Sequence, residues 1–516
     1  MDNSFPLGIG LLGGSRLAIE LQTLIERATA GQTLNRSRVF LPSWFYSSIE
    51  DSFWIWCEYH APSEAKFDEK TAYDRHRMQA GNDWEERYVA TSFPSAHVIK
   101  SPWGEAAVRE TLEAMLRGES AIGGGALWLL AEDVCGKADV LVRCDDHSSD
   151  LGDFHYRVKE VKNAGEMKEY YQLQAAVYHW VLSELQGFSP KSFDVVLQEG
   201  KGEVTVAFDM VADEMKSQLD QWRAIRDGET QLEPLALDST NSPWRRYANQ
   251  RVRQRRDLSI LPGVGLKTAI QWRTRGFESL DDILAAGASG DMGRLPNSDC
   301  YYHALAFQKG QPVFRPGEAA QIRRKERLVH FDVEDTSVLD GELVTRPHTY
   351  MIGVATPDGD TTIWTARGED DEARMWTNFL DWLGNPQQVA LYCWTMYESA
   401  KLNQAAGDHP ALAERLLAAE AALIDLKEEI KHRPYFPVTS YSIKSVAPVC
   451  GFNWSQDDVD GQSAQLMYLD WLKSGDDSII RRVEQYNRED VLAMLAVDQY
   501  VCGLSTNVGN AFWCEF

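Results

Sequence analysis

Features that mark membrane and secreted proteins are missing from this 516-residue sequence. No apolar run reaches the roughly 20 residues that a membrane-spanning helix needs. The first residues, MDNSFPLGIGLLGG, include an apolar patch but lack the basic residues with which a signal peptide begins. We therefore expect a cytoplasmic protein with no membrane partner.

Cysteine pairs at short spacing are also missing. The eight cysteines are scattered, and no two of them form a C-x-x-C pair. That spacing fits neither a zinc ribbon nor a compact disulfide framework. We expect reduced thiols, most of them packed in the interior.

Basic residues are scarce, with 52 Lys and Arg against 77 Asp and Glu and a net charge of −25. This balance argues against a nucleic-acid partner, because phosphate binding relies on basic side chains. Local charge matters more than the sum, however, and the stretch RRYANQRVRQRR, residues 245–256, contains no acid. We predict that a polyanion such as DNA binds to its six arginines: Arg245, Arg246, Arg251, Arg253, Arg255 and Arg256.

The length predicts two or three domains, and the 44% hydrophobic content is typical of a soluble globular protein. The mixture of helix and strand patterns along the chain predicts a multidomain α/β fold. Residues 1–235 form the first predicted domain. Its patterns predict helices at 73–93, 166–187 and 212–228, and strands at 125–134, 137–144, 154–162, 192–198 and 203–210.

Three further regions follow. Residues 236–300 are basic and helical, 301–325 are a predicted linker, and 326–516 form a second α/β unit. That unit has predicted strands at 327–335, 348–357, 361–367 and 388–394, a helix at 370–384, and mainly helices afterwards. Three strands, a helix, a strand and more helices is the order of an RNase H-like domain.

The stretch VHFDVEDTS, residues 329–337, places two acids on one strand face. Asp332 and Glu334 are two residues apart, so they point the same way, whereas Asp335 lies on the opposite face and is left out. The pair could mark an exposed strand edge or a turn at Glu334. It could also bind a divalent metal, since Mg²⁺ and Mn²⁺ prefer oxygen ligands.

Further candidates lie downstream. Tyr486 and Asp490 are four residues apart, and therefore share one helical face. Glu398 follows a strand at the start of a helix, and Asp425 in ALIDLKEEI is a weaker candidate. By themselves, Tyr486 and Asp490 could equally belong to an ordinary surface helix.

Together these residues resemble the DEDD superfamily of 3′-to-5′ exonucleases, with D-x-E on the first strand and a late Y-x-x-x-D helix. The chain departs from the usual pattern, because Glu398 in Tyr397-Glu398 stands where an Asp is common. A subgroup of predicted RecB-family nucleases has Y-E there, followed by Y-S-x-K, and SYSIKSVAP at 440–448 matches it. The resemblance implies two Mg²⁺ or Mn²⁺ ions, about 4 Å apart, and Tyr486 orienting the attacking water.

The first domain carries a second set of residues. Asp139 lies in GKADVLV, and Glu160 and Lys162 share a strand face in RVKEVKNAG. Alternating charges also occur on any solvated strand. With His76, Gly81 and Glu85 on the preceding helix, and Gln174 and Tyr178 on the following one, the set resembles the PD-(D/E)xK fold of RecB-like and CRISPR-associated nucleases.

That resemblance implies roles for these residues. Asp139 and Glu160 would hold Mg²⁺ with Glu85 as an extra ligand, and Lys162 would position or activate water. Many such nucleases hold an iron–sulfur cluster with one early and three late cysteines. Cys57 stands at the early place, but the late region NSPWRRYANQRVRQRR has no cysteine, so we predict no cluster and a packed Cys57.

Between the two units, LPGVGLK at 261–267 resembles a helix-hairpin-helix. Gly263 and Gly265 would let backbone N–H groups approach a DNA phosphate, and Lys267 could add a charge. A plain αα-hairpin, or one that only packs domains together, is the alternative.

These features predict a metal-dependent DNA nuclease with two active sites. Its substrate would be single-stranded or end-containing DNA, processed in repair or in defence against foreign DNA such as that of phages. One alternative is a DNA-binding scaffold with one or both centres inactive that recruits a protein partner. Another is a DEDD exonuclease that acts on RNA.

Overall fold

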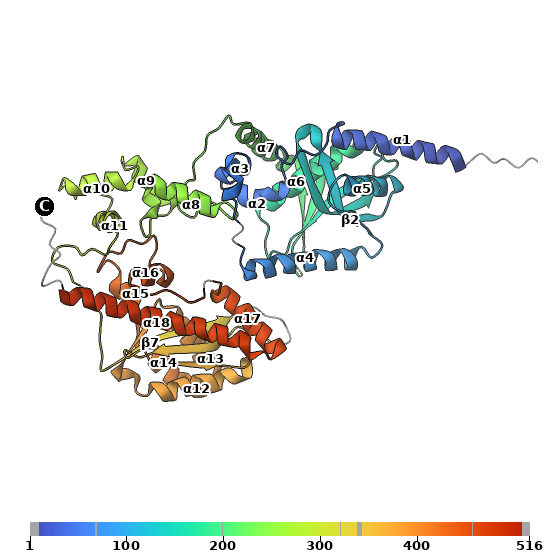
Figure 1. The fold of residues 1–516 in the computed structure, drawn as a ribbon. Coiled ribbons are helices and arrows are strands. Elements are labelled where there is room, and N and C mark those ends of the chain that lie inside the picture. Colours follow the sequence, from blue (N-terminus) through green and yellow to red (C-terminus); the bar gives the residue numbers. More distant parts are fainter. Residues whose placement is uncertain are drawn as a thin grey trace, which may run out of the picture. The chain divides into compact units, whose positions relative to one another are not determined.

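The computed structural model describes residues 10–67, 70–198, 200–290, 292–319, 321–337, 343–456 and 458–507. The chain divides into two units (Figure 1). The first contains Met1–Lys70 and Asp74–Asn249, and the second contains Thr71–Tyr73 and Gln250–Phe516. No helix among the described residues is both long enough and apolar enough to cross a membrane.

A six-stranded sheet forms the centre of the N-terminal unit. Strands β2, β3 and β4 are antiparallel neighbours, and β5 returns parallel to β4 after helix α6. The sheet order follows the chain: β1 (His97–Val98), β2 (Ala121–Leu129), β3 (Val134–Cys144), β4 (His155–Val161), β5 (Ser192–Val196) and β6 (Glu203–Ala207).

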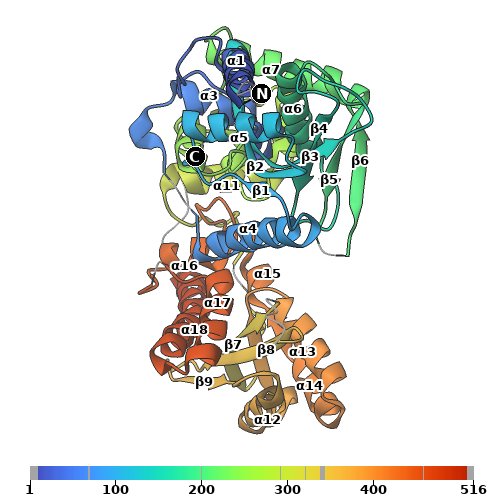
Figure 2. The same ribbon diagram turned by 90° about the vertical axis from the view of Figure 1, so that its right-hand side faces the viewer.

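Helices cover both faces of this sheet. Alternating residues divide between the faces, so that Leu141 joins the large core beneath α5 and α6, whereas Val140 packs with Val89 of α4 on the other side (Figure 2). The helices are α1 (Gly10–Thr29), α2 (Phe45–Ser48), α3 (Ser52–His60), α4 (Ala72–Ser92), α5 (Glu105–Arg117), α6 (Glu169–Gln186) and α7 (Ala212–Arg226).

A helical segment opens the C-terminal unit. It consists of α8 (Arg245–Gln254), which begins in the first unit, α9 (Leu266–Thr274), α10 (Leu280–Ala288) and α11 (Ser298–Lys309). Helix α11 extends into the stretch 301–325, which we predicted to be a linker. Asn297 caps it by accepting a hydrogen bond from the Cys300 N–H, a local start signal that the prediction overlooked.

A five-stranded sheet follows, in the order β11-β10-β7-β8-β9. The antiparallel strands β7, β8 and β9 come first in the chain, and β10 and β11 then add parallel to β7. The strands are β7 (Arg327–Thr336), β8 (His348–Ala355), β9 (Thr361–Thr365), β10 (Val389–Cys393) and β11 (Leu423–Asp425). The three-residue strand β11 was not predicted.

Helices again cover both faces of the sheet. Phe331 of β7 packs with Trp376 of α12 on one face, and Tyr392 of β10 packs with Met494 of α18 on the other (Figure 1). The side chains of Asp332 and Glu334 alternate with Phe331, and so point toward α18. The helices are α12 (Glu372–Leu383), α13 (Tyr397–Asp408), α14 (Ala413–Glu420), α15 (Leu426–Ile430), α16 (Ile443–Val449), α17 (Gly461–Ser474) and α18 (Asp477–Asn507).

Candidate metal-binding active sites

Three carboxylates converge on one face of the C-terminal sheet. Asp332 and Glu334 come from β7, and Asp490 comes from α18, more than 150 residues later in the chain. One oxygen of each lies within 4.8 Å of the other two. Glu334 and Asp490 are each only 8% exposed, so their charges have little access to water. Such a group repels itself unless a cation or a proton lies within it.

Burial and mutual repulsion raise the pKa values of these acids. Burial, reinforced by Asp490, raises the pKa of Glu334 to about 8. Burial, reinforced by Glu334, raises the pKa of Asp332 well above its usual range. Burial also raises the pKa of Asp490, although Lys444 and Trp454 oppose this effect. Without a metal, the protein therefore tends to keep protons on this cluster at neutral pH.

Asn487 of α18 ties the two strand acids together. Its amide nitrogen donates to Asp332 Oδ2 at 2.7 Å and lies 3.5 Å from Glu334 Oε1. Asp332 pairs across the sheet with Gly353, and a Cβ at Gly353 would lie 2.0 Å from Asn487 Oδ1. Only a glycine at this place lets α18 approach β8 so closely.

Lys444 brings a positive charge to the site. Its ammonium group lies 3.3 Å from Asp490 Oδ1, and the Trp454 indole N–H donates to the same oxygen at 2.7 Å. The ammonium group also lies 4.5 Å from the centre of the Tyr486 ring. We predicted no role for Lys444, Trp454 or Asn487. For Lys444 the signal was present, since it is the lysine of the Y-S-x-K motif.

Asp425 is the last residue of β11, and Glu398 lies five residues after the end of β10. Glu398 is in the first turn of α13, is 4% exposed, and has a buried Oε2 with no hydrogen-bond partner. Burial, helped by the charge of Asp425, raises the pKa of Glu398 to about 7. Asp425 caps α15 by accepting from the Glu428 N–H at 3.0 Å.

Asp335 belongs to a separate ion pair. The β7–β8 register shifts between Glu334 and Asp335. The Lys401 ammonium donates to Asp335 Oδ2 at 2.6 Å, and the Tyr397 hydroxyl donates to its other oxygen. The structure therefore supplies no reason to add Asp335 to the metal ligands.

The donor set suits a hard divalent cation. The converging atoms in this cluster are carboxylate oxygens, which Mg²⁺ and Mn²⁺ prefer, and the cluster holds no thiol or imidazole. Glu398 lies near this cluster, since its charge helps to raise the pKa of Asp332, and its buried Oε2 could add a further oxygen ligand. The residues present thus fit the metal that a D-x-E site implies.

Comparison with known families supports the same domain. A family model of the RNase_H superfamily matches residues 329–502. The C-terminal unit contains an RNase H-like domain. An RNase H-like domain indicates a nuclease-type, metal-dependent phosphodiester hydrolase. A comparison with curated proteins finds no match to the chain.

The N-terminal unit has its own buried carboxylate, Glu160 of β4. Glu160 is fully buried, and its Oε1 accepts from Lys162 at 2.7 Å and from Gln174 of α6 at 2.8 Å. Its other oxygen has no hydrogen-bond partner. The neighbouring Asp139 of β3 accepts from the Val161 N–H at 2.7 Å and lies 3.9 Å from the Lys162 ammonium.

The charge of Asp139 acts both on Glu160 and on Glu85 of α4. Burial, and then repulsion by Asp139, raises the pKa of Glu160 to about 8 and that of Glu85 to about 7. Burial alone would lower the pKa of Lys162, but Glu160 and Asp139 outweigh it and raise that pKa. Lys162 is therefore a cation at neutral pH.

The remaining residues of the RecB-like set differ in position. Tyr178 is buried on α6, and its ring fills the space beside Gly136, where a Cβ would lie 2.4 Å from it. His76 is exposed, about two and a half turns of α4 before Glu85. Among the described contacts, none joins His76 to the carboxylates. Cys57 is buried in α3.

The predicted DNA-binding segment lies around α8 and α9. Gly263 and Gly265 are exposed just before α9, Gly263 has a positive φ of 78°, and Lys267 is exposed in the first turn. Two arginines of the run form ion pairs with acids of the same helical segment. Arg255 pairs with the buried Asp257 at 3.0 Å, and Arg256 pairs with Asp281 at 2.9 Å.

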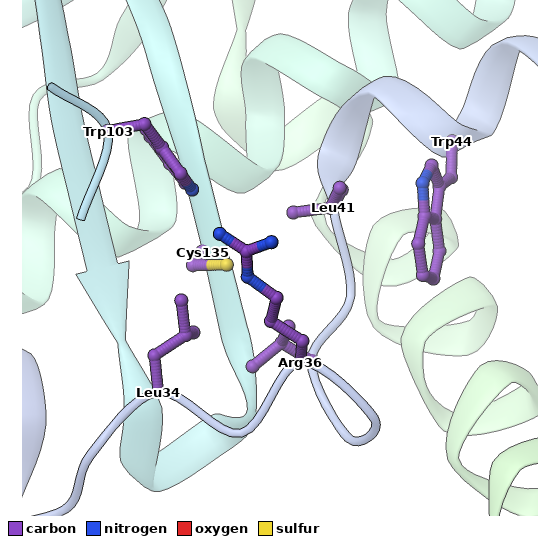
Figure 3. Close-up of a pocket in the computed structure, with 7 residues that line it drawn as sticks. Leu34, Arg36, Leu41, Trp44, Trp103 and Cys135 are labelled. Carbon is purple, nitrogen blue, oxygen red and sulfur yellow. The ribbon is translucent and has the colours of Figure 1, made fainter. Parts of the chain in front are cut away.

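A pocket of about 300 Å³ opens elsewhere on the N-terminal unit (Figure 3). Two tryptophans, Trp44 and Trp103, stand at its sides, and Arg36 is its charged residue. None of the candidate metal ligands lines it. The lining residues are Leu34, Arg36, Val39, Leu41, Trp44, Trp103 and Cys135.

Proposed function

We propose that this protein is a Mg²⁺- or Mn²⁺-dependent nuclease that hydrolyses phosphodiester bonds in DNA. The observation that carries the proposal is the convergence of Asp332, Glu334 and Asp490. Their oxygens lie within 4.8 Å of one another inside an RNase H-like domain. A protein keeps such a self-repelling group when a cation that it binds offsets the cost.

Asp332, Glu334, Asp490 and Glu398 would hold the metal in this site. The bound metal would make a water nucleophilic and stabilise the charge that develops on the phosphodiester. Burial and Asp490 raise the pKa of Tyr486 above its usual range. Tyr486 therefore keeps its proton and can orient a water through its hydroxyl. Together these roles describe a DEDD-type 3′-to-5′ exonuclease site.

We infer a second nuclease site in the N-terminal unit. Asp139 and Glu160 would hold a metal there, with Glu85 as a further ligand. Lys162 is charged and lies 2.7 Å from Glu160 and 3.9 Å from Asp139. A protonated lysine cannot accept a proton, so it would act by positioning the water and by stabilising negative charge on the phosphate.

DNA is the proposed substrate because of the residues around α8 and α9. The exposed Arg245, Arg246 and Arg253 and the exposed turn before α9 could contact phosphates. Such contacts are independent of base sequence, which suits an enzyme that processes DNA ends in repair or in defence against foreign DNA.

The test compares cleavage of labelled single-stranded and double-stranded DNA and RNA, with Mg²⁺ or Mn²⁺ and with chelator. The variants are Asp332→Ala, Asp139→Ala and the double mutant. Asp335→Asn and Asp194→Asn are matched controls, because these acids lie on or beside the same strands but pair with Lys401 and with Arg157.

We expect each single variant to lose one activity and the double variant to lose both, while the controls keep them. Cleavage that survives the double substitution or the chelator contradicts the proposal. Cleavage of RNA alone would move the substrate to RNA. DNA binding by the wild type without any cleavage would favour a scaffold that recruits a partner.

A further inference from the structure

The far end of the β3–β4 hairpin carries a group of residues that neither proposed active site uses. Cys144 is the last residue of β3 and lies directly across the ladder from His155, the first residue of β4. Directly opposed residues on one sheet face have neighbouring side chains. Asp146 and His147 follow two and three residues after Cys144, in the connecting loop.

These side chains bring different donor atoms together. The sulfur of Cys144, an oxygen of Asp146 and a ring nitrogen of His155 lie within 4.8 Å of one another. The His155 side chain is only 2% exposed, and its Nδ1 lies 3.2 Å from the His147 carbonyl oxygen. The same Nδ1 lies 3.6 Å from Asp146 Oδ1, so it is the nitrogen that faces the group, and a bound ion would replace its contact with the carbonyl.

His147 is a candidate for a fourth ligand. Its Nδ1 lies 3.3 Å from Asp146 Oδ2, and its ring centre is 6.2 Å from that of His155. The side chains of His147 and Asp146 are 60% and 70% exposed, so both can turn without disturbing the core. Bonds of about 2.0–2.3 Å to zinc require the donors to close together by roughly an ångström.

The chemistry of this group differs from that of the two carboxylate clusters. A thiolate and imidazole ligands with one carboxylate favour Zn²⁺, whereas carboxylates alone favour Mg²⁺ or Mn²⁺. Cys144 lies five positions after Asp139, a distance of about 17 Å along β3. The group is therefore a separate location on the same hairpin.

We propose that Cys144, Asp146 and His155, with His147 as the fourth ligand, form a structural Zn²⁺ site that fastens the end of the β3–β4 hairpin. On binding, the Cys144 thiol releases its proton to solvent and the sulfur bonds to the ion. No electron is transferred. The site holds together the two strands that carry Asp139 and Glu160, and it does not depend on whether those acids cut DNA.

Cobalt substitution tests this site. The full-length protein, freed of any affinity tag and stripped with a chelator, is titrated with Co²⁺ and then with Zn²⁺. We expect a thiolate-to-cobalt charge-transfer band whose final intensity corresponds to one thiolate site per chain and which disappears as Zn²⁺ displaces cobalt. The variants are Cys144→Ser, Asp146→Ala and His147→Ala. Cys450→Ser is the matched control, since Cys450 is another half-buried thiol.

Cys144→Ser should abolish the band. Asp146→Ala and His147→Ala should weaken Zn²⁺ affinity by more than about 10-fold, since loss of even an outer-shell partner costs that much. If Cys144→Ser does not fold, the Zn²⁺ affinities of Asp146→Ala and His147→Ala still test the proposal. An absent band in the wild type, unchanged affinity in both exposed variants, or loss of the band in Cys450→Ser would overturn the proposal.

Discussion

Replacing Glu334 with Gln should stabilise the metal-free protein, although it removes a proposed metal ligand. Burial and Asp490 raise the pKa of Glu334 from 4.5 to about 8 in the folded state. At pH 7 the folded protein must therefore keep a proton on this acid, whereas the unfolded chain has released it. One pKa unit corresponds to about 1.4 kcal/mol, so the cost at pH 7 is about 3 kcal/mol at most.

The sign of the pH dependence follows from the same values. Because the folded pKa lies above the unfolded one, the folded state binds more protons between pH 4.5 and about 8. Stability therefore falls as the pH rises through that window and levels off above it. Glutamine has no proton to lose, so the advantage of Glu334→Gln should be absent near pH 4 and greatest above about pH 8.

The assay follows thermal unfolding of wild type and Glu334→Gln in chelator at several pH values. For a domain of this size, about 3 kcal/mol corresponds to a rise in Tm of roughly 6–12 °C. Mg²⁺ should reverse the order by stabilising the wild type more. Glu489→Gln is the control, because hydrogen bonds from Ser455 and Gln485 lower the pKa of Glu489 against the effect of burial. That change should destabilise.

A Glu334→Gln variant that melts below the wild type in chelator at pH 7 and pH 8 would refute this reasoning. The raised pKa would then have no energetic consequence, and the cluster would be stabilised in another way. Equal destabilisation by Glu334→Gln and Glu489→Gln would lead to the same conclusion.

Other predictions concern the same domain. Mg²⁺ affinity, measured by calorimetry, should increase with pH up to about 8, because Glu334 must lose its proton to bind the ion. Lys444→Met should tighten Mg²⁺ binding in the same experiment, since it removes a cation 3.3 Å from Asp490 Oδ1; weaker binding would contradict this. Gly353→Ala should cost about 1–3 kcal/mol in thermal unfolding, because its Cβ would lie 2.0 Å from Asn487 Oδ1, and an unchanged Tm would count against that contact.

The sequence predicted the elements whose residue pattern is regular. Period-two alternation in β7 placed Asp332 and Glu334 on one face, and a spacing of four placed Tyr486 and Asp490 on one face of α18. A family match supports the RNase H-like domain that these elements build. The three-residue β11 escaped prediction, because it is defined by pairing with β10 and has no periodicity of its own.

Sequence patterns alone did not predict the contacts between elements that lie far apart in the chain. Asn487 looked like an ordinary helix residue, and only the docking of α18 against β7 and β8 brings its amide to Asp332. Likewise, the arginine run contains no acid, yet Arg256 pairs with Asp281 of α10. Such partners cannot be predicted from local sequence patterns, because they depend on how distant elements pack together. The two-site arrangement and the DNA-binding segment remain predictions.

The late position of α18 has a consequence for the timing of synthesis. All residues proposed for the N-terminal site lie between positions 76 and 178, whereas the RNase H-like site needs Asp490. At 5–20 residues per second, roughly 15 to 60 s separate the synthesis of Tyr178 from that of Asp490. A ribosome-bound chain therefore passes through a period in which only the first set of carboxylates can assemble.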